Sequence, residues 1–139
     1  MAYNGPGLWI DDGAGPVQNP ALTQTQFNTN LALWQAANGE QFYQNALTVI
    51  AAFMDPLAAM IVATGAAIGD SNALSVVKWI HSIYTYYTTN LATVKGWATP
   101  TAMDQSMMGY TTLVTPPVTL LAVATSVLAA LNTKYPGKV

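Results

Sequence analysis

Cysteine and arginine are absent from this chain of 139 residues, and charged residues of every kind are scarce. Only 7% of the residues are charged, whereas a soluble domain typically carries about 25%. Without cysteine the chain can form no disulfide, no thiolate nucleophile and no cysteine-ligated metal site. The same absence leaves the redox compartment open, because it fits an oxidising and a reducing environment equally.

Positive charge is limited to four lysines, two of which lie within the last six residues. They are Lys78, Lys95, Lys134 and Lys138, and the formal net charge is −2. Affinity for nucleic acid depends on clustered lysine and arginine, and arginine is the usual bidentate reader of bases and phosphates. We therefore expect no direct binding of nucleic acid.

Signals of disorder and of export are also missing. The chain is 52% hydrophobic with a low net charge, which is the opposite of a disordered composition. Its length suffices for one domain with a core of its own. The first 20 residues contain no basic segment followed by an apolar one, so we do not expect them to act as a secretory signal.

Glycine and proline are concentrated in residues 1–20, which hold four Gly and three Pro. This density argues against a helix or a central strand, whereas the apolar residues among them argue against a fully solvated tail. The pattern predicts an extended N-terminal arm that docks into a groove, either of its own chain or of a neighbour. We expect the arm to make inter-subunit contacts through Tyr3, Leu8, Trp9 and Ile10.

Helix start and stop signals recur along the rest of the chain. Asn19-Pro20 resembles a helix start, and Asn38-Gly39 resembles the end of that helix. A second helix, 40–68, should kink or break at Asp55-Pro56. A third, amphipathic helix is expected over 72–95, with its cap supplied by Asp70-Ser71-Asn72.

The last third of the chain continues the helical pattern. Thr101 followed by Asp104 fits the start of a short helix that ends near Tyr110, and a final helix is expected over 116–132. The prediction is an all-α fold, a small antiparallel helical bundle of four to five helices with an extended Gly/Pro-rich N-terminal arm. Residues 1–20 form the arm and residues 21–139 the helical bundle domain.

Two of the expected helices, 40–68 and 116–132, are apolar on nearly every face. A helix of this kind is either central to a core or covered by something other than water. Three coverings are open: a lipid bilayer, neighbouring copies of the chain, or a core beneath a surface of uncharged polar residues. The chain holds 38 Thr, Asn, Gln and Ser, enough for such a surface.

Small and aromatic side chains are the candidates for packing contacts. Small residues allow helices to approach closely, and the candidates for close helix packing are Ala59, Ala63, Gly65, Ala67 and Gly69. Aromatic residues are enriched in interface cores, and the candidates for aromatic packing are Trp79, Tyr84, Tyr87 and Trp97.

No constellation of catalytic or metal-binding residues is visible. His81 is the only histidine, and a general base needs an orienting carboxylate that the sequence does not place beside it. Asp11-Asp12-Gly13 resembles the start of a calcium loop, but the later ligand positions are missing. We expect no enzyme, no catalytic or metal site and no cofactor.

The sequence predicts a structural protein that assembles with copies of itself into a filament or virion shell, as a coat or capsid protein does. Apolar helix packing and the N-terminal arm would hold this homo-oligomer together. Its expected location is a virion or an extracellular surface assembly. The main alternative is a membrane-associated helical protein that forms a pore or contacts lipid, and the third is a carrier of a small apolar ligand.

Overall fold

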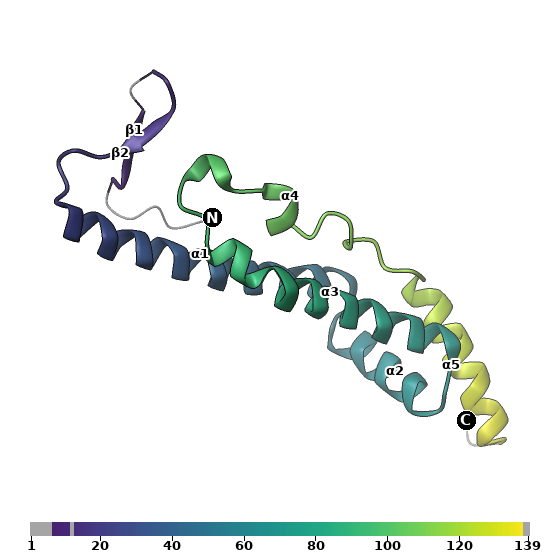
Figure 1. Ribbon diagram of the computed structural model, residues 1–139. Coiled ribbons are helices and arrows are strands. Elements are labelled where there is room, and N and C mark those ends of the chain that lie inside the picture. The colour runs from purple at the N-terminus through teal and green to yellow at the C-terminus, as the bar shows by residue number, and fades with distance from the viewer. Residues whose placement is uncertain (1–6, 12, 138–139) are drawn as a thin grey trace. The chain divides into compact units, whose positions relative to one another are not determined.

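The structure is a computed structural model that describes residues 7–11 and 13–137. The chain is mostly helical, as expected, with one small two-stranded sheet near the N-terminus (Figure 1). The elements within the described residues are β1 (Trp9–Asp11), β2 (Pro16–Gln18), α1 (Gln24–Phe53), α2 (Pro56–Ala67), α3 (Ser71–Lys95), a 3₁₀ turn (Pro100–Ala102), α4 (Gln105–Met108) and α5 (Leu120–Lys134).

The chain divides into two compact units, which we describe separately. The first unit comprises Met1–Asn45 and Tyr87–Gly109, and the second comprises Ala46–Tyr86 and Tyr110–Val139. Helices α1 and α3 each contribute residues to both units.

The first unit begins with a β-hairpin in place of a straight arm. β1 and β2 pair antiparallel, with Ile10 opposite Val17. Asn19 closes the base of the hairpin, because its backbone N–H donates to the Leu8 carbonyl at 2.9 Å and its amide donates to the Gly7 carbonyl at 2.6 Å. The Gly/Pro-rich segment therefore forms a hairpin whose base is closed by hydrogen bonds. The predicted extended arm is not confirmed.

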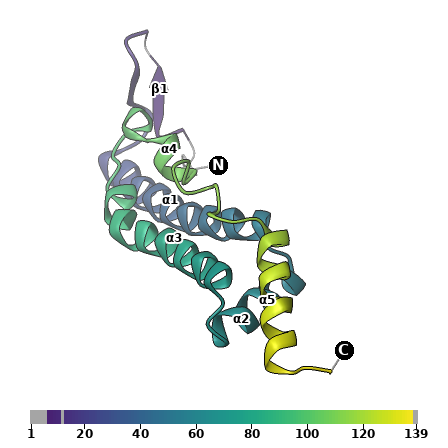
Figure 2. The same cartoon turned by 90° about the vertical axis from the view of Figure 1, so that its right-hand side faces the viewer.

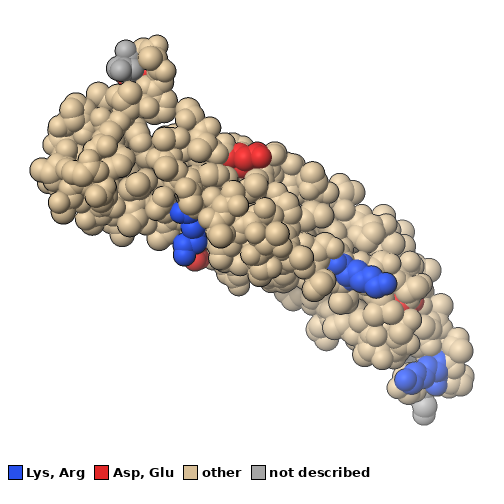
Figure 3. Space-filling view, in the orientation of Figure 1, with Lys and Arg blue, Asp and Glu red and all other residues tan. Residues whose placement is uncertain are grey.

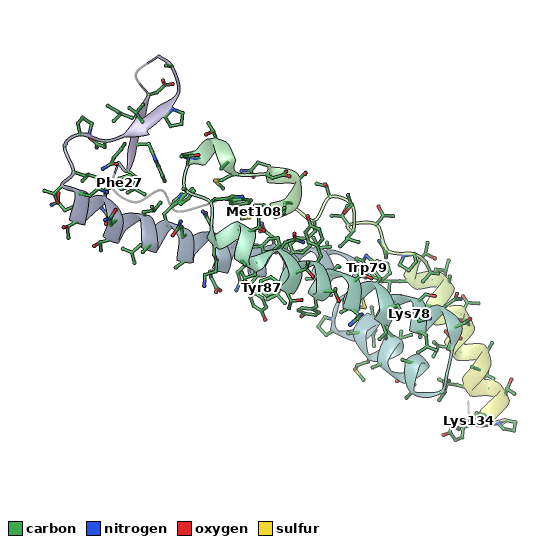
Figure 4. The ribbon with its side chains drawn as sticks, viewed as in Figure 1. Phe27, Lys78, Trp79, Tyr87, Met108 and Lys134 are labelled. Atoms are coloured by element: carbon green, nitrogen blue, oxygen red, sulfur yellow. The ribbon has the colours of Figure 1, made fainter. Side chains whose placement is uncertain are left out.

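The hairpin packs on α1 of its own chain (Figure 1). Leu8 is fully buried, and the Trp9 ring meets Phe27 and Trp34 edge-on, with ring centroids 6.0 and 4.9 Å away. Figure 4 labels Phe27 on α1 close to the hairpin. Of the four residues expected in inter-subunit contacts, Leu8 and Trp9 pack within the chain, Ile10 is exposed, and Tyr3 lies outside the described residues.

Helix α1 begins later than Asn19-Pro20 and runs past the predicted stop at Asn38-Gly39. Thr23 and Gln26 form a reciprocal capping box at its start. The Thr23 N–H donates to the Gln26 side-chain oxygen at 2.9 Å, and the Gln26 N–H donates to the Thr23 hydroxyl oxygen at 3.1 Å. Asn38 and Gly39 are both buried within α1, and a Cβ at Gly39 would lie 2.9 Å from Cγ of Lys95 on α3. Gly39 therefore lies in the interior of α1 against a flexible side chain, and the predicted helix end was wrong.

The other helix starts follow local capping chemistry. The predicted break at Asp55-Pro56 is confirmed, since the Asp55 carboxylate accepts the Ala58 N–H at 2.8 Å and Pro56 occupies the first turn of α2. Asp70 caps α3 through the Ala73 N–H at 2.9 Å, as expected. Helix α5 begins at Leu120 rather than near residue 116, because Thr119 supplies its cap.

The short helix α4 is capped by Asp104 instead of Thr101. The Asp104 carboxylate accepts hydrogen bonds from the Ser106 hydroxyl at 2.7 Å and from the Met107 N–H at 3.2 Å. The Ser106 hydroxyl, with the Met107 N–H adding to it, holds the pKa of this exposed carboxyl below its usual range.

In the second unit α2 and α5 pack side by side (Figure 2). Gly65 makes this possible, because a Cβ there would collide with a methyl group of Val127 and lie 2.6 Å from the Ala73 Cβ. Ser126 of α5 also donates to the Asp70 carboxylate at 2.9 Å and accepts from the Asn72 amide at 3.2 Å. These hydrogen bonds fix α5 against the first turn of α3.

Candidate functional site

Helix α2 places small residues inward and its largest residues outward. It buries Ala58, Val62 and Gly65, whereas Leu57 and Met60 are each 66% exposed. A helix of a globular protein ordinarily turns its large apolar side chains toward the core. The outward side of α2 therefore lacks the water-facing residues that a surface helix usually carries.

Helix α5 repeats this arrangement. Val123 and Val127 are buried, whereas Leu121 is 77% and Leu128 58% exposed. Leu121 and Leu128 are seven residues apart and so share one stripe of the helix. Leu57 of α2 and Leu121 of α5 line one groove, and we call the surface around these two residues the α2–α5 face.

A groove of about 280 Å³ lies along this face. Its lining comes from the start of both helices and is almost wholly apolar: Asp55, Leu57, Ala58, Ile61, Leu120, Leu121, Val123 and Ala124. The one carboxylate, Asp55, accepts a backbone hydrogen bond as the cap of α2. The groove therefore suits an apolar side chain and offers little to a polar or charged ligand.

Charge is nearly absent around the α2–α5 face. Lys134, at the end of α5, is the one charged residue within the two helices. Figure 3 shows charged residues only as isolated groups on an otherwise uncharged surface. Any partner of this face must therefore be bound through apolar contact and shape.

Hydroxyl groups on the helices of the second unit bond to their own backbone. Ser75, Ser82, Thr125 and Thr133 each donate to the carbonyl four residues earlier, at 2.8–3.1 Å. Their donors are thus already occupied within the helix.

The small residues expected in close helix packing lie in different surroundings. Gly65 is buried between helices, whereas Ala59, Ala63 and Ala67 are exposed on the outward side of α2. Gly69 is exposed and has φ of +80°, the left-handed conformation that ends a helix. The sequence marked the correct helix but could not separate its inner from its outer side.

The expected aromatic cluster is divided between the two units. In the second unit Trp79 is buried against Phe53 and Tyr84 is exposed. In the first unit Tyr87 packs on Phe42 and Tyr43, and Trp97 is buried with its carbonyl accepting the Gln35 amide. Figure 4 labels Trp79 and Tyr87 on α3. Trp79, Tyr87 and Trp97 therefore serve internal packing in separate cores, and Tyr84 does not.

A second cavity, of about 370 Å³, lies beside Trp79 in the second unit. It is lined by Ser75, Lys78, Trp79, Ser82, Thr115 and Pro117. The Trp79 indole N–H donates to the Leu113 carbonyl at 2.6 Å, which leaves Lys78 as the main polar group. His81 is exposed, and within residues 7–11 and 13–137 no three His, Asp or Glu converge to hold a metal ion.

Asn38 is the buried polar residue that the sequence reading missed. Its side chain is 0% exposed, and neither its amide nitrogen nor its carbonyl oxygen has a hydrogen-bond partner among the residues that the structure describes. An orphaned pair of buried polar atoms costs about 1–3 kcal/mol for each unsatisfied group. Asn38 therefore weakens the core of the first unit.

Replacing Asn38 by leucine, which has a similar shape, should raise the free energy of unfolding by about 1–2 kcal/mol, because both desolvated groups disappear. Urea unfolding followed by circular dichroism would measure the change. Asn45→Leu is the control, since Asn45 donates to the Met108 carbonyl at 3.0 Å and should lose stability. A destabilised Asn38→Leu variant would mean that the amide has a partner.

Among the described residues no single helix is both long and apolar enough to cross a membrane. Helices α1 and α2 meet that length and composition only as a pair, and the pair is bent by 84° at its break.

Comparison of the chain with family models, with curated proteins and with solved structures finds no match.

Proposed function

We propose that the protein is a structural subunit that assembles with copies of itself into a filament or virion shell. In this proposal the helices form a bundle within each subunit, and the assembly stands on a virion or an extracellular surface. The protein has no catalytic role and needs no cofactor in it.

The observation that supports this proposal is the spread of exposed large apolar residues over many elements. They occur on the hairpin, on α1, α2, α3 and α5, between α4 and α5, and directly after α5: Ile10, Val17, Leu33, Leu57, Met60, Leu74, Val77, Tyr84, Val114, Leu121, Leu128 and Tyr135. A single partner would cover one patch, whereas neighbours in a lattice cover several.

Burial of these residues would supply the driving force. Removing apolar surface from water contributes about 25 cal/mol per Å², or about 1.5–3 kcal/mol for one fully covered leucine. Charged groups are depleted in interface cores, and the chain has few of them to desolvate. Assembly of this kind needs no ion pairs.

The hairpin has one side free for a neighbour. Ile10 and Val17 form a cross-strand pair, and both side chains are exposed. Trp9, on the opposite side, packs on α1. The arm contact of the proposal is therefore assigned to Ile10 and Val17.

A lipid-contacting protein is the second candidate, because α2 exposes the large apolar side chains of Leu57 and Met60. Electron microscopy and sedimentation of the purified chain without detergent separate the two candidates. Regular polymers support assembly. A chain that is soluble only with detergent supports the lipid candidate, and a soluble monomer contradicts the proposed assembly.

Assembly should persist from about 50 mM to about 1 M salt, because screening over this range weakens charge pairs and leaves apolar contacts intact. Light scattering of the polymer across the range would test this. Dissociation at high salt would show that charge pairs hold the polymer, and would contradict the apolar contact.

A further inference from the structure

We propose that the cavity beside Trp79 in the second unit binds a small carboxylate that carries an apolar body. This binding goes beyond the proposed self-assembly, and neither depends on the other. Three features support it: a lysine without a partner at the cavity, side-chain donors suited to an acceptor, and an apolar wall that the fold holds in place.

The Lys78 ammonium group makes no hydrogen bond or ion pair with any residue that the structure describes. The other charged groups described in the second unit have partners. The carboxylates of Asp55 and Asp70 accept backbone hydrogen bonds as helix caps, and the Lys134 ammonium lies 5.8 Å from the centre of the Tyr135 ring. Lys78 is exposed and lines the cavity, so its charge is available to attract an anion.

The side-chain donors that line the cavity favour a ligand that only accepts hydrogen bonds. The hydroxyl groups of Ser75 and Ser82 each donate to a carbonyl of α3 at 3.0 Å. The Lys78 ammonium and the Thr115 hydroxyl have no such partner among the described residues and are left to donate to a ligand. A carboxylate has two oxygens that accept and none that donates, so it matches these two donors.

The apolar wall of the cavity is fixed by contacts outside it. Trp79 is 7% exposed, and its ring packs edge-on against Phe53 with the ring centroids 5.3 Å apart. Its indole N–H donates to the Leu113 carbonyl at 2.6 Å, which ties the segment before α5 to α3. Pro117, the other apolar residue of the wall, has a φ fixed by its ring. A wall formed in advance lowers the entropic cost of binding.

The lining residues lie close enough together for one small ligand. Ser75, Lys78, Trp79 and Ser82 follow the spacing of a single helix face, and Figure 4 labels Lys78 and Trp79 on α3. The volume of about 370 Å³ is near the lower end of the ~300–1,000 Å³ of small-molecule pockets. A ligand with one ring against Trp79 and a carboxylate at Lys78 therefore suits the cavity.

Ligand-observed NMR titration of the full chain tests this site, because it detects weak binding to a monomer and to a polymer alike. The probe is 3-phenylpropionate. Its matched control is 3-phenylpropionamide, which has the same body without the charge. We expect a dissociation constant on the order of 1 mM or tighter for the carboxylate. The amide should bind about tenfold more weakly, because it lacks the charge that pairs with Lys78.

Variants of the two lysines locate the binding. Lys78→Met keeps the length of the side chain and removes its charge, so it should weaken binding of 3-phenylpropionate about tenfold and leave binding of the amide unchanged. Lys78→Arg keeps the charge, and Lys134→Met removes the other lysine charge described in this unit. Both should bind the carboxylate as the wild type does. Lys78 is exposed, so helical circular dichroism should be the same in all variants.

The opposite results would overturn the site. Equal affinity of the wild type for the carboxylate and the amide would show that Lys78 selects no anion. An equal loss of affinity in Lys134→Met would place the binding elsewhere. Displacement of 3-phenylpropionate by an equal concentration of inorganic phosphate would show that the apolar wall adds nothing. A wild type that binds neither ligand would remove the site and leave the proposed self-assembly untouched.

Discussion

Replacing Trp34 by alanine is expected to lower the free energy of unfolding by about 3–5 kcal/mol, the usual cost of truncating a buried large aromatic residue. Trp34 is 1% exposed on α1, and its ring meets Trp9 of the hairpin at 4.9 Å. Edge-to-face aromatic pairs add about 0.5–1.5 kcal/mol to the area that they bury. The truncation removes both contributions and leaves a cavity beneath β1.

Chemical unfolding measures the loss, and hydrogen exchange locates it. The amides of Ile10 and Val17, which face each other as a hydrogen-bonded pair, should lose protection first, because the hairpin has lost its support on α1. Leu33→Ala is the matched control, since Leu33 precedes Trp34 and is exposed; it should cost less than about 1 kcal/mol. A loss of the same small size for Trp34→Ala would mean that the hairpin does not pack on α1.

Gly65→Ala is expected to lower the free energy of unfolding by about 2–3 kcal/mol. Alanine in a helix interior is ordinarily better than glycine by about 0.5–1 kcal/mol. At Gly65 the new methyl group would collide with Val127 and with the Ala73 Cβ, which are held by α5 and by the first turn of α3. The overlap must move whole helices, so it outweighs the gain in propensity.

Gly39→Ala is the control for this argument. The nearest atoms there are Cγ and Cδ of Lys95, at 2.9 and 3.1 Å, and that flexible side chain can turn away. The variant should be unchanged in stability or gain up to about 1 kcal/mol. Thermal and urea unfolding of the two variants would compare them, and a Gly65→Ala variant as stable as Gly39→Ala would contradict the packing of α2 against α5.

Helix ends set by local chemistry were predictable from the sequence. Asp55-Pro56 separates α1 from α2, and Asp70 begins α3, because a carboxylate cap and a proline in the first turn act within a few residues. The end predicted at Asn38-Gly39 was wrong, since both residues lie buried inside α1, where tertiary packing outweighs a local stop signal. Gly39 lies against Lys95, 56 positions later, and no local pattern reports such an approach.

The hairpin shows a similar division. The density of glycine and proline in residues 1–20 correctly excluded a helix. It did not show whether the segment reaches a neighbouring subunit or folds back on its own chain. Trp9 packs between Phe27 and Trp34, and this contact depends on the position of α1. The pairing of Ile10 with Val17 depends on it as well. In the structure Trp9 packs on α1 of its own chain.

The candidate site was located in the sequence only to the level of helices. Segments 40–68 and 116–132 were identified as apolar on every face, and the α2–α5 face lies within them. Periodicity could not show which side points outward, because the two sides differ in size rather than in polarity. Leu57 faces out and Ala58 faces in, and hydropathy treats both as core residues.

The back-bonded hydroxyl groups of Ser75, Ser82, Thr125 and Thr133 have a consequence for the removal of water. A donor that already bonds to a carbonyl needs no new partner when the surface dries, so the usual penalty for dehydrating a polar group is smaller. A surface that is polar by composition thus gives up its hydration shell at low cost. Contact with a second protein at these four positions would therefore leave no hydroxyl donor without a partner.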